Sequence, residues 1–109
     1  MIIAIDFDGT IVDHEYPEIG SLKYGAVKAL KSFKKAGHQI IIWTCRQGDD
    51  ERQVRLFLRK NKIPFDTVNT PIPGFDLATR KIYADVYIDD KGIKYANNWD
   101  EIRKLLTGK

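Results

Sequence analysis

The chain opens with a short apolar run, Met1 to Phe7, which leads into the acidic segment Asp6-Phe7-Asp8-Gly9-Thr10. An apolar run of this length is typical of a strand that is buried on both faces of a parallel sheet. Because side chains alternate along a strand, we expect Asp6 and Asp8 to project the same way from its end. Gly9 allows a tight turn there, and its N–H can approach an anion. The segment therefore constrains the fold to a sheet that presents two carboxylates at one strand end.

Strand and helix patterns alternate along the rest of the chain. Strands are predicted over residues 1–7, 39–44, 66–69 and 84–89, and helices over residues 25–36, 49–62 and 95–106. Asp49 or Asp50 is expected to cap the second helix. Residues 11–24 have no clear period and contain Pro17 and Gly20, so they are interpreted as a loop.

This order of elements predicts an α/β fold, a three-layer sandwich with a mainly parallel, Rossmann-like sheet. The 109 residues are expected to form a single domain. In such sheets, ligands bind outside the carboxyl ends of the strands. The polar residues that follow the predicted strands at this edge are Asp6 and Asp8, Thr44, and the pair Asp89 and Asp90.

The composition is that of an ordinary globular protein, with 43% hydrophobic and 30% charged residues. No apolar stretch approaches the ~18 residues of a membrane-spanning helix. The first residues lack the basic segment and cleavable apolar segment of a secretory signal. The single cysteine, Cys45, cannot form an internal disulfide, which suits a reducing compartment. We therefore expect a cytoplasmic protein with no membrane partner.

Charge is distributed unevenly, although the formal net charge is only +3. Residues 1–20 carry five acids and no Lys or Arg, whereas residues 21–62 carry eleven Lys or Arg against three acids. An acidic start beside a basic middle fits a metal site next to an anion-attracting surface. The simpler interpretation is that the lysines of residues 28–35 form the solvated face of a helix.

The ordered set Asp6-x-Asp8-Gly9-Thr10, Thr44, Lys81 and Asp89-Asp90 resembles the motifs of the haloacid dehalogenase (HAD) superfamily of phosphohydrolases. The resemblance implies that Asp6 is the nucleophile, which takes the phosphoryl group as an aspartyl phosphate. Asp8 is then the general acid for the leaving group and the base for the hydrolytic water. The implied metal is Mg²⁺, held by Asp6, the backbone carbonyl of Asp8, Asp89 and Asp90. A cation is needed because a carboxylate that attacks a phosphate dianion meets charge repulsion.

The resemblance also implies residues that bind the phosphoryl oxygens. Thr44 is expected to offer its hydroxyl and Gly9 its N–H, and Lys81 is expected to supply a positive charge. Because only seven residues separate Lys81 from Asp89, Arg80 and Lys91 are alternatives for this role.

Three further residues lie close to the predicted site in the sequence. Arg46 follows Thr44 and is interpreted either as a ligand for a distal phosphate or substrate carboxylate, or as a surface residue. Cys45 is expected to be inert, because no nearby histidine activates it. His14 follows the acidic segment and is a candidate for substrate contact.

Members of the superfamily usually carry an inserted cap domain. Residues 11–24 and 70–83 offer only 14 positions each, too few for a cap, so the chain resembles a minimal cap-less member. An uncapped site needs another cover to exclude water. The candidates are the 11–24 loop, the 71–75 loop and a second subunit, and apolar Tyr16, Ile72 and Phe75 favour a homo-oligomer.

The predicted function is a Mg²⁺-dependent phosphatase that acts on a phosphate monoester, either a small molecule or a macromolecule. The alternative is a catalytically weak or inactive module that binds nucleic acid or another phosphorylated partner through the basic middle of the chain.

Overall fold

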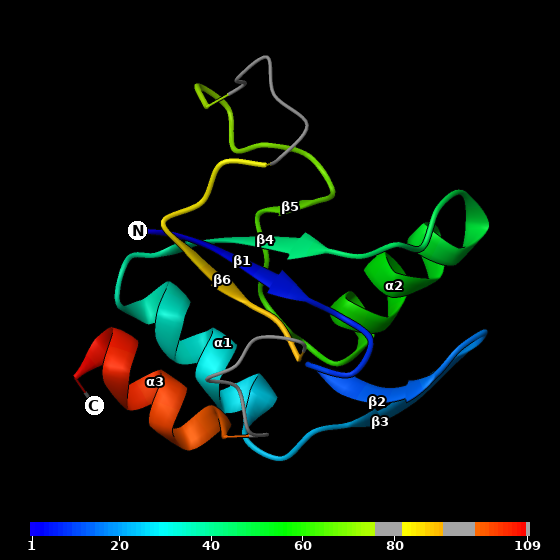
Figure 1. The fold of residues 1–109 in the computed structure, drawn as a ribbon, viewed down its shortest axis with the longest axis horizontal. Coiled ribbons are helices and arrows are strands. Elements are labelled where there is room, and N and C mark those ends of the chain that lie inside the picture. Colours follow the sequence, from blue (N-terminus) through cyan, green and yellow to red (C-terminus); the bar gives the residue numbers. More distant parts are fainter. Residues whose placement is uncertain (76–81, 91–97, 109) are drawn as a thin grey trace.

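The computed structural model describes residues 1–75, 82–90 and 98–108. Within these residues, a parallel four-stranded sheet has the order β5-β4-β1-β6 (Figure 1). Its strands are β1 (Ile2–Asp6), β4 (Gln39–Trp43), β5 (Thr67–Val68) and β6 (Val86–Ile88). The helices of the described chain are α1 (Ala26–Lys35), α2 (Asp49–Lys60) and α3 (Trp99–Thr107). The predicted α/β class and the parallel sheet are confirmed.

The strand order determines which face of the sheet each connection crosses. The chain steps from β1 to β4 through α1, and onward in the same direction from β4 to β5 through α2. Because such crossovers are right-handed, two steps in one direction place both helices on the same face. The connection from β5 to β6 steps back past β4 and β1, and its described residues Ile72 and 82–84 pack on the opposite face. α3 follows β6 and lies beside α1 (Figure 1).

Side-chain alternation divides the sheet residues between two cores. Ile3 and Ile5 of β1 share the larger core with residues of all these helices, including Leu30, Leu58 and Trp99. Ile2, Ala4 and Ile41 face the other way and pack against Ile72, with residues 82–84 beside them. The sheet is therefore buried on both faces, which explains the unbroken apolar run at the start of the chain.

The predicted three-layer sandwich stays a prediction, because the described helices form one layer. α1, α2 and α3 all contribute to one core, on one face of the sheet. On the opposite face, the described cover consists of Ile72 and residues 82–84, which lie in the connection from β5 to β6. The sequence pattern predicted the strands of the parallel sheet and the described helices, but not the strand order that places these helices together.

Residues 11–24 contain a β-hairpin, so their interpretation as a loop was wrong. β2 (Val12–Glu15) pairs with β3 (Glu18–Leu22) in an antiparallel two-stranded sheet. Most of its side chains are exposed, so the apolar alternation that identifies a half-buried strand is missing. Gly20 permits the close pairing, because a Cβ there would lie 2.2 Å from the carbonyl oxygen of Asp13.

The start of α2 also differs from the prediction. α2 has Gly48 at its N-cap and no side-chain capping bond, so the predicted aspartate cap is wrong. Asp49 and Asp50 lie instead in the first turn, where the helix dipole favours negative charge. The described part of the closing helix begins at Trp99, and the predicted start at Tyr95 lies outside the described residues. None of the helices described is long and apolar enough to cross a membrane.

Candidate active site

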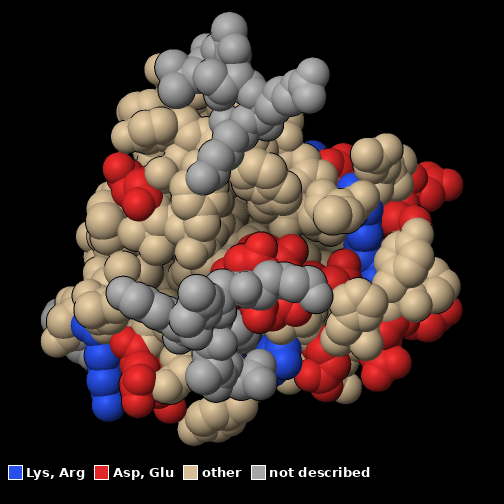
Figure 2. Space-filling model, in the orientation of Figure 1, with Lys and Arg blue, Asp and Glu red and all other residues tan. Residues whose placement is uncertain are grey.

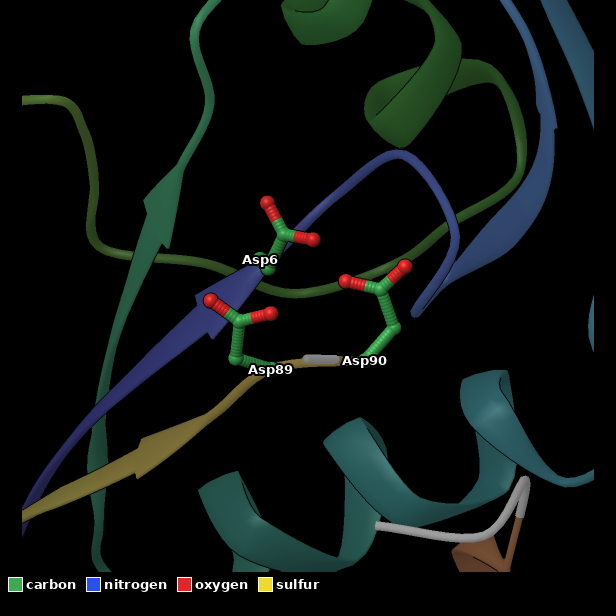
Figure 3. Close-up of side chains that lie close together, drawn as sticks. All are labelled: Asp6, Asp89 and Asp90. Atoms are coloured by element: carbon green, nitrogen blue, oxygen red, sulfur yellow. The ribbon is translucent and has the colours of Figure 1, made fainter. Parts of the chain in front are cut away.

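Asp6, Asp89 and Asp90 meet at the carboxyl edge of the sheet. Asp6 ends β1, and the other two follow β6, which pairs with β1 in parallel, so both strand ends lie at the same edge. Carboxylate oxygens of these aspartates lie within 4.8 Å of one another. Figure 3 shows their carboxyl groups turned toward a common space, and Figure 2 shows acidic side chains gathered near the middle of this face of the molecule.

This carboxylate cluster, Asp6, Asp89 and Asp90, carries unfavourable electrostatics. Burial raises the pKa of Asp6 to about 7, and the charges of Asp89 and Asp90 add to the effect. All the donor atoms are carboxylate oxygens, the ligands preferred by hard cations such as Mg²⁺. A divalent cation between them would relieve the repulsion, so the residues fit the predicted metal.

Thr10 connects the two halves of this cluster. Its hydroxyl donates to Oδ2 of Asp6 (3.2 Å) and accepts the backbone N–H of Asp90 (3.0 Å). Its carbonyl accepts the indole N–H of Trp99 (2.9 Å), at the start of α3. Thr10 is completely buried, so these bonds hold Asp6 and Asp90 in fixed relation to the helical layer.

Gly9 makes the close approach of Asp90 possible. It has a φ of +86°, and a Cβ there would lie 2.2 Å from Oδ2 of Asp90. Its N–H donates to the carbonyl of Val12 (2.8 Å). The amide therefore closes the loop in this structure, and the predicted contact of this N–H with a phosphoryl oxygen is not available while that bond is made.

Asp8 lies in a different environment. Its carboxylate oxygens accept bonds from Nε (2.8 Å) and Nη2 (2.9 Å) of Arg46. Hydrogen bonding to Asp8 raises the pKa of Arg46 above its ordinary value. The side chain of Arg46 is only 2% exposed. The interpretation of Arg46 as a surface residue is therefore wrong. Its role as a substrate ligand stays a prediction, because Arg46 also lines the hollow beside the carboxylate cluster.

Arg46 also binds the β2–β3 hairpin. Nη1 donates to the carbonyl of Pro17 (3.0 Å), and Nη2 donates to the carbonyl of Glu18 (2.8 Å). The guanidinium carbon lies 5.0 Å from the centre of the Tyr16 ring, a cation–π distance. One buried side chain thus joins the acidic loop to the hairpin turn.

Thr44 ends up at the carboxyl edge as predicted, directly after β4, and it is buried. Its hydroxyl oxygen accepts the N–H of Arg46 (3.1 Å), and its own N–H donates to Oδ1 of Asn69 (2.8 Å). The first of these is the local bond that competes with a phosphate role, although the hydroxyl proton stays available for donation. The predicted phosphate contact of Thr44 stays a prediction.

Asn69 was not singled out in the sequence. It directly follows β5, has a positive φ of 58°, and also donates to Glu51 of α2 (3.0 Å). It thereby fixes the turn that carries Thr44 and Arg46. Its place at a predicted strand end was the available sequence signal.

Two hollows adjoin the carboxylate cluster among the described residues. One, of about 460 Å³, is lined by the cluster and Asp8 together with His14, Tyr16 and Cys45. The other, of about 280 Å³, lies on the sheet face away from the helices, where Trp43 and Tyr87 form its aromatic wall. The first hollow places His14 where substrate contact was predicted.

The remaining expectations have mixed outcomes. Lys81 and its alternatives Arg80 and Lys91 lie outside the described residues, so the predicted phosphate-binding cation stays a prediction. Ile72 is only 2% exposed, so it does not offer the apolar interface surface that was expected of it. Tyr16 and Phe75 are 56% and 40% exposed, as an interface would require.

Neither a protein-family model nor a curated protein matches the chain. A solved structure of a conserved protein from Bacteroides thetaiotaomicron is similar to it, with a TM-score of 0.90 and 34% sequence identity. The match covers 99% of this chain and 90% of that chain. The likeness therefore extends to the sequence and to nearly the whole length of both proteins. The chain belongs to the family of that conserved Bacteroides thetaiotaomicron protein.

Proposed function

We propose that the protein is a Mg²⁺-dependent phosphohydrolase of the HAD superfamily, with a HAD-like Rossmann core and no cap. It hydrolyses a phosphate monoester through an aspartyl phosphate on Asp6. The observation that carries this proposal is the convergence of Asp6, Asp89 and Asp90 within 4.8 Å at the carboxyl edge of a parallel sheet. Carboxylates that repel one another are costly to bring together, and a bound cation would offset their repulsion.

The residues of the chain divide the reaction between them. Asp6 attacks phosphorus with a carboxylate oxygen, and the bond from phosphorus to the ester oxygen breaks. Asp8 gives a proton to the departing alcohol and then takes one from the water that hydrolyses the aspartyl phosphate. Inorganic phosphate leaves, and Asp6 is regenerated. Mg²⁺, held by Asp6, Asp89 and Asp90, would supply positive charge that offsets the negative charge of the phosphate.

The pKa of Asp6 ties this chemistry to metal binding. A pKa of about 7 leaves a large fraction of Asp6 protonated at neutral pH when no metal is bound. The protonated carboxyl is neither a nucleophile nor a good ligand. Ionisation of Asp6 and metal binding therefore favour each other.

The test is hydrolysis of p-nitrophenyl phosphate and of a panel of phosphorylated metabolites and polymers, with and without Mg²⁺. We expect Mg²⁺-dependent turnover and a covalent phosphoenzyme in the wild type, and neither in Asp6→Asn. Asp49→Asn is the matched control, because the Asp49 side chain is 91% exposed on α2. Turnover by Asp6→Asn at a rate near that of the wild type contradicts the mechanism.

A second candidate function is the binding of a phosphate polymer by α1. Lys28, Lys31 and Lys35 line a shallow hollow along this helix, and their cationic groups suit the regularly spaced charges of a nucleic-acid backbone. Salt-dependent binding of DNA or RNA that persists in Asp6→Asn and is lost in a Lys28→Glu, Lys31→Glu variant would support this function.

A further inference from the structure

We propose that Arg46 is a positioning residue that couples the β2–β3 hairpin to Asp8. The position of the hairpin at the site and the orientation of the acid–base carboxyl group of Asp8 would then change together. The inference rests on the proposed function, in which Asp8 transfers protons. It assigns to the hairpin an effect on catalysis that acts through the bonds of Arg46 to Asp8.

The hydrogen-bond geometry of the guanidinium carries the first step. Nε and Nη2 hold both oxygens of Asp8, while Nη1 and Nη2 hold the carbonyls of Pro17 and Glu18. The guanidinium is planar and rigid, so the two sets of bonds cannot be oriented independently. A shift of the hairpin turn therefore moves or breaks the bonds to Asp8.

The backbone of Arg46 is held by hydrogen bonds of its own, which fix the point from which its side chain extends. Its N–H donates to the hydroxyl of Thr44, and its carbonyl accepts the amide of Asn69 (3.5 Å). Tyr16 covers the guanidinium from the hairpin side, and its hydroxyl donates to Asp50 of α2 (3.4 Å). The hairpin turn is thus held against the β4–α2 region by contacts that centre on Arg46.

The hairpin needs such contacts to stay in place. It is a two-stranded sheet apart from the main one, and residues 13–18 are exposed. Isolated two-stranded sheets are marginally stable in water. His14 and Tyr16 of this hairpin line the same hollow as Asp8. Loss of the guanidinium would therefore remove the contacts that hold the hairpin wall of the hollow and those that hold Asp8.

The experiment compares Arg46→Met with Asp8→Asn, and uses Arg52→Gln as the control, because Arg52 lies exposed on α2. Hydrogen exchange reports on residues 13–20. Arg46→Met is expected to raise the exchange rates there by ~10-fold or more, as in local opening. Asp8→Asn should leave these residues protected, because Arg46 keeps its bonds to Pro17 and Glu18.

Kinetics supply a readout that a purely structural role would not change. Arg46→Met and Asp8→Asn should both lower kcat for an alkyl phosphate by ~10²-fold, the typical contribution of acid–base catalysis. The loss should be much smaller for p-nitrophenyl phosphate, whose leaving group needs little protonation. Methylguanidinium should restore part of the activity of Arg46→Ala. Arg46→Lys, which keeps the charge but not the fork, should lie between the wild type and Arg46→Met.

Unchanged exchange in the hairpin of Arg46→Met overturns the coupling, as does an equal kcat loss for both substrates. If Arg46→Met does not fold, Arg46→Lys decides the same two questions. If the wild type hydrolyses neither substrate, the proposed function fails. The exchange comparison between the Arg46 and Asp8 variants then still decides whether Arg46 holds the hairpin.

Discussion

Asp6 and Asp8 lie two positions apart in one segment, yet they meet opposite electrostatic environments. Asp6 faces Asp89 and Asp90, and its pKa is raised to about 7. Asp8 is held at both oxygens by the guanidinium of Arg46. The ion pair fixes the orientation of the Asp8 carboxylate, whereas the repulsion among Asp6, Asp89 and Asp90 favours a bound cation. Such contrasts between neighbouring carboxyl groups separate their roles in many active sites.

The backbone explains how neighbouring residues reach such different partners. β1 ends at Asp6, whose side chain continues the face of Ile2 and Ala4 toward the end of β6. Asp8 lies beyond the strand, in the loop that Gly9 turns. Both aspartates line the same hollow, as the alternation predicted, and Asp8 is the one that accepts the bonds of Arg46.

The largest expected effect is that of Asp6→Asn, which should change both the turnover rate and the melting temperature. Asp6→Asn should lower turnover by roughly 10⁴-fold or more, as expected on removal of a covalent nucleophile. The same change should raise the melting temperature of the metal-free protein, because it removes one of the repelling charges of the cluster. Steady-state kinetics and thermal unfolding in a chelator measure both effects. A fall in melting temperature would contradict the repulsion within the cluster.

Asp8→Asn should shift stability in the opposite direction. The amide can accept only one of the two bonds from the guanidinium, so the buried Arg46 is left partly unpaired. We expect a loss of about 1–3 kcal/mol in the free energy of unfolding, the cost of an unsatisfied buried group. Denaturant unfolding in a chelator measures it, with Asp49→Asn as the exposed control. If Asp6→Asn and Asp8→Asn shift stability alike, the contrast between the two sites is wrong.

The part of the fold that could be predicted is the part with a buried face. The apolar runs of β1 and β4 and the spacing of Leu30 and Phe33 in α1 follow from burial against a core, and burial leaves a periodic pattern in the sequence. The hairpin lacks that pattern because most of it is exposed. The face on which each helix lies depends on the strand order, which periodicity does not encode.

The carboxylate cluster could be predicted because each of its members follows a strand, and strand ends meet at one edge of a parallel sheet. The partner of Asp8 could not, because Asp8 and Arg46 both lie beyond the strand ends, where strand alternation no longer determines side-chain direction. Its bonds to Pro17 and Glu18 depend on a hairpin that the sequence pattern did not reveal.

The effect of Mg²⁺ on thermal stability should distinguish the carboxylate cluster from Asp8. A ligand that binds only the folded state raises its stability by mass action, by about 2.7 kcal/mol at a concentration of 100 times Kd. The resulting rise in melting temperature should be smaller in Asp89→Asn. It should persist in Asp8→Asn, because the side chain of Asp8 is paired with Arg46. Thermal unfolding across a Mg²⁺ titration measures the shift. An unchanged shift in Asp89→Asn would remove Asp89 from the metal site.

A further expected effect is a pH dependence of stability that comes from Asp6. Its pKa is about 7 in the folded chain, against an ordinary value of 3.8. Between these values, the folded state keeps a proton that the unfolded state has lost. Stability of the metal-free protein should therefore fall as pH rises from about 4 to 7, and this contribution should level off above pH 7. Unfolding measured over this range, with Asp6→Asn as the reference, isolates the contribution.

The affinity for Mg²⁺ should depend on pH through the same proton on Asp6. Below pH 7, Mg²⁺ must displace the proton of Asp6, so affinity should rise with pH and become constant above about pH 7. Calorimetry in buffers of different ionisation enthalpy counts the protons released. We expect nearly one proton per Mg²⁺ at pH 5.5 and few at pH 8. Asp8→Asn should keep this profile, because Asp8 takes no part in the repulsion. An affinity that is independent of pH would mean that Asp6 is already ionised in the metal-free protein, and the contrast with Asp8 would lose its electrostatic basis.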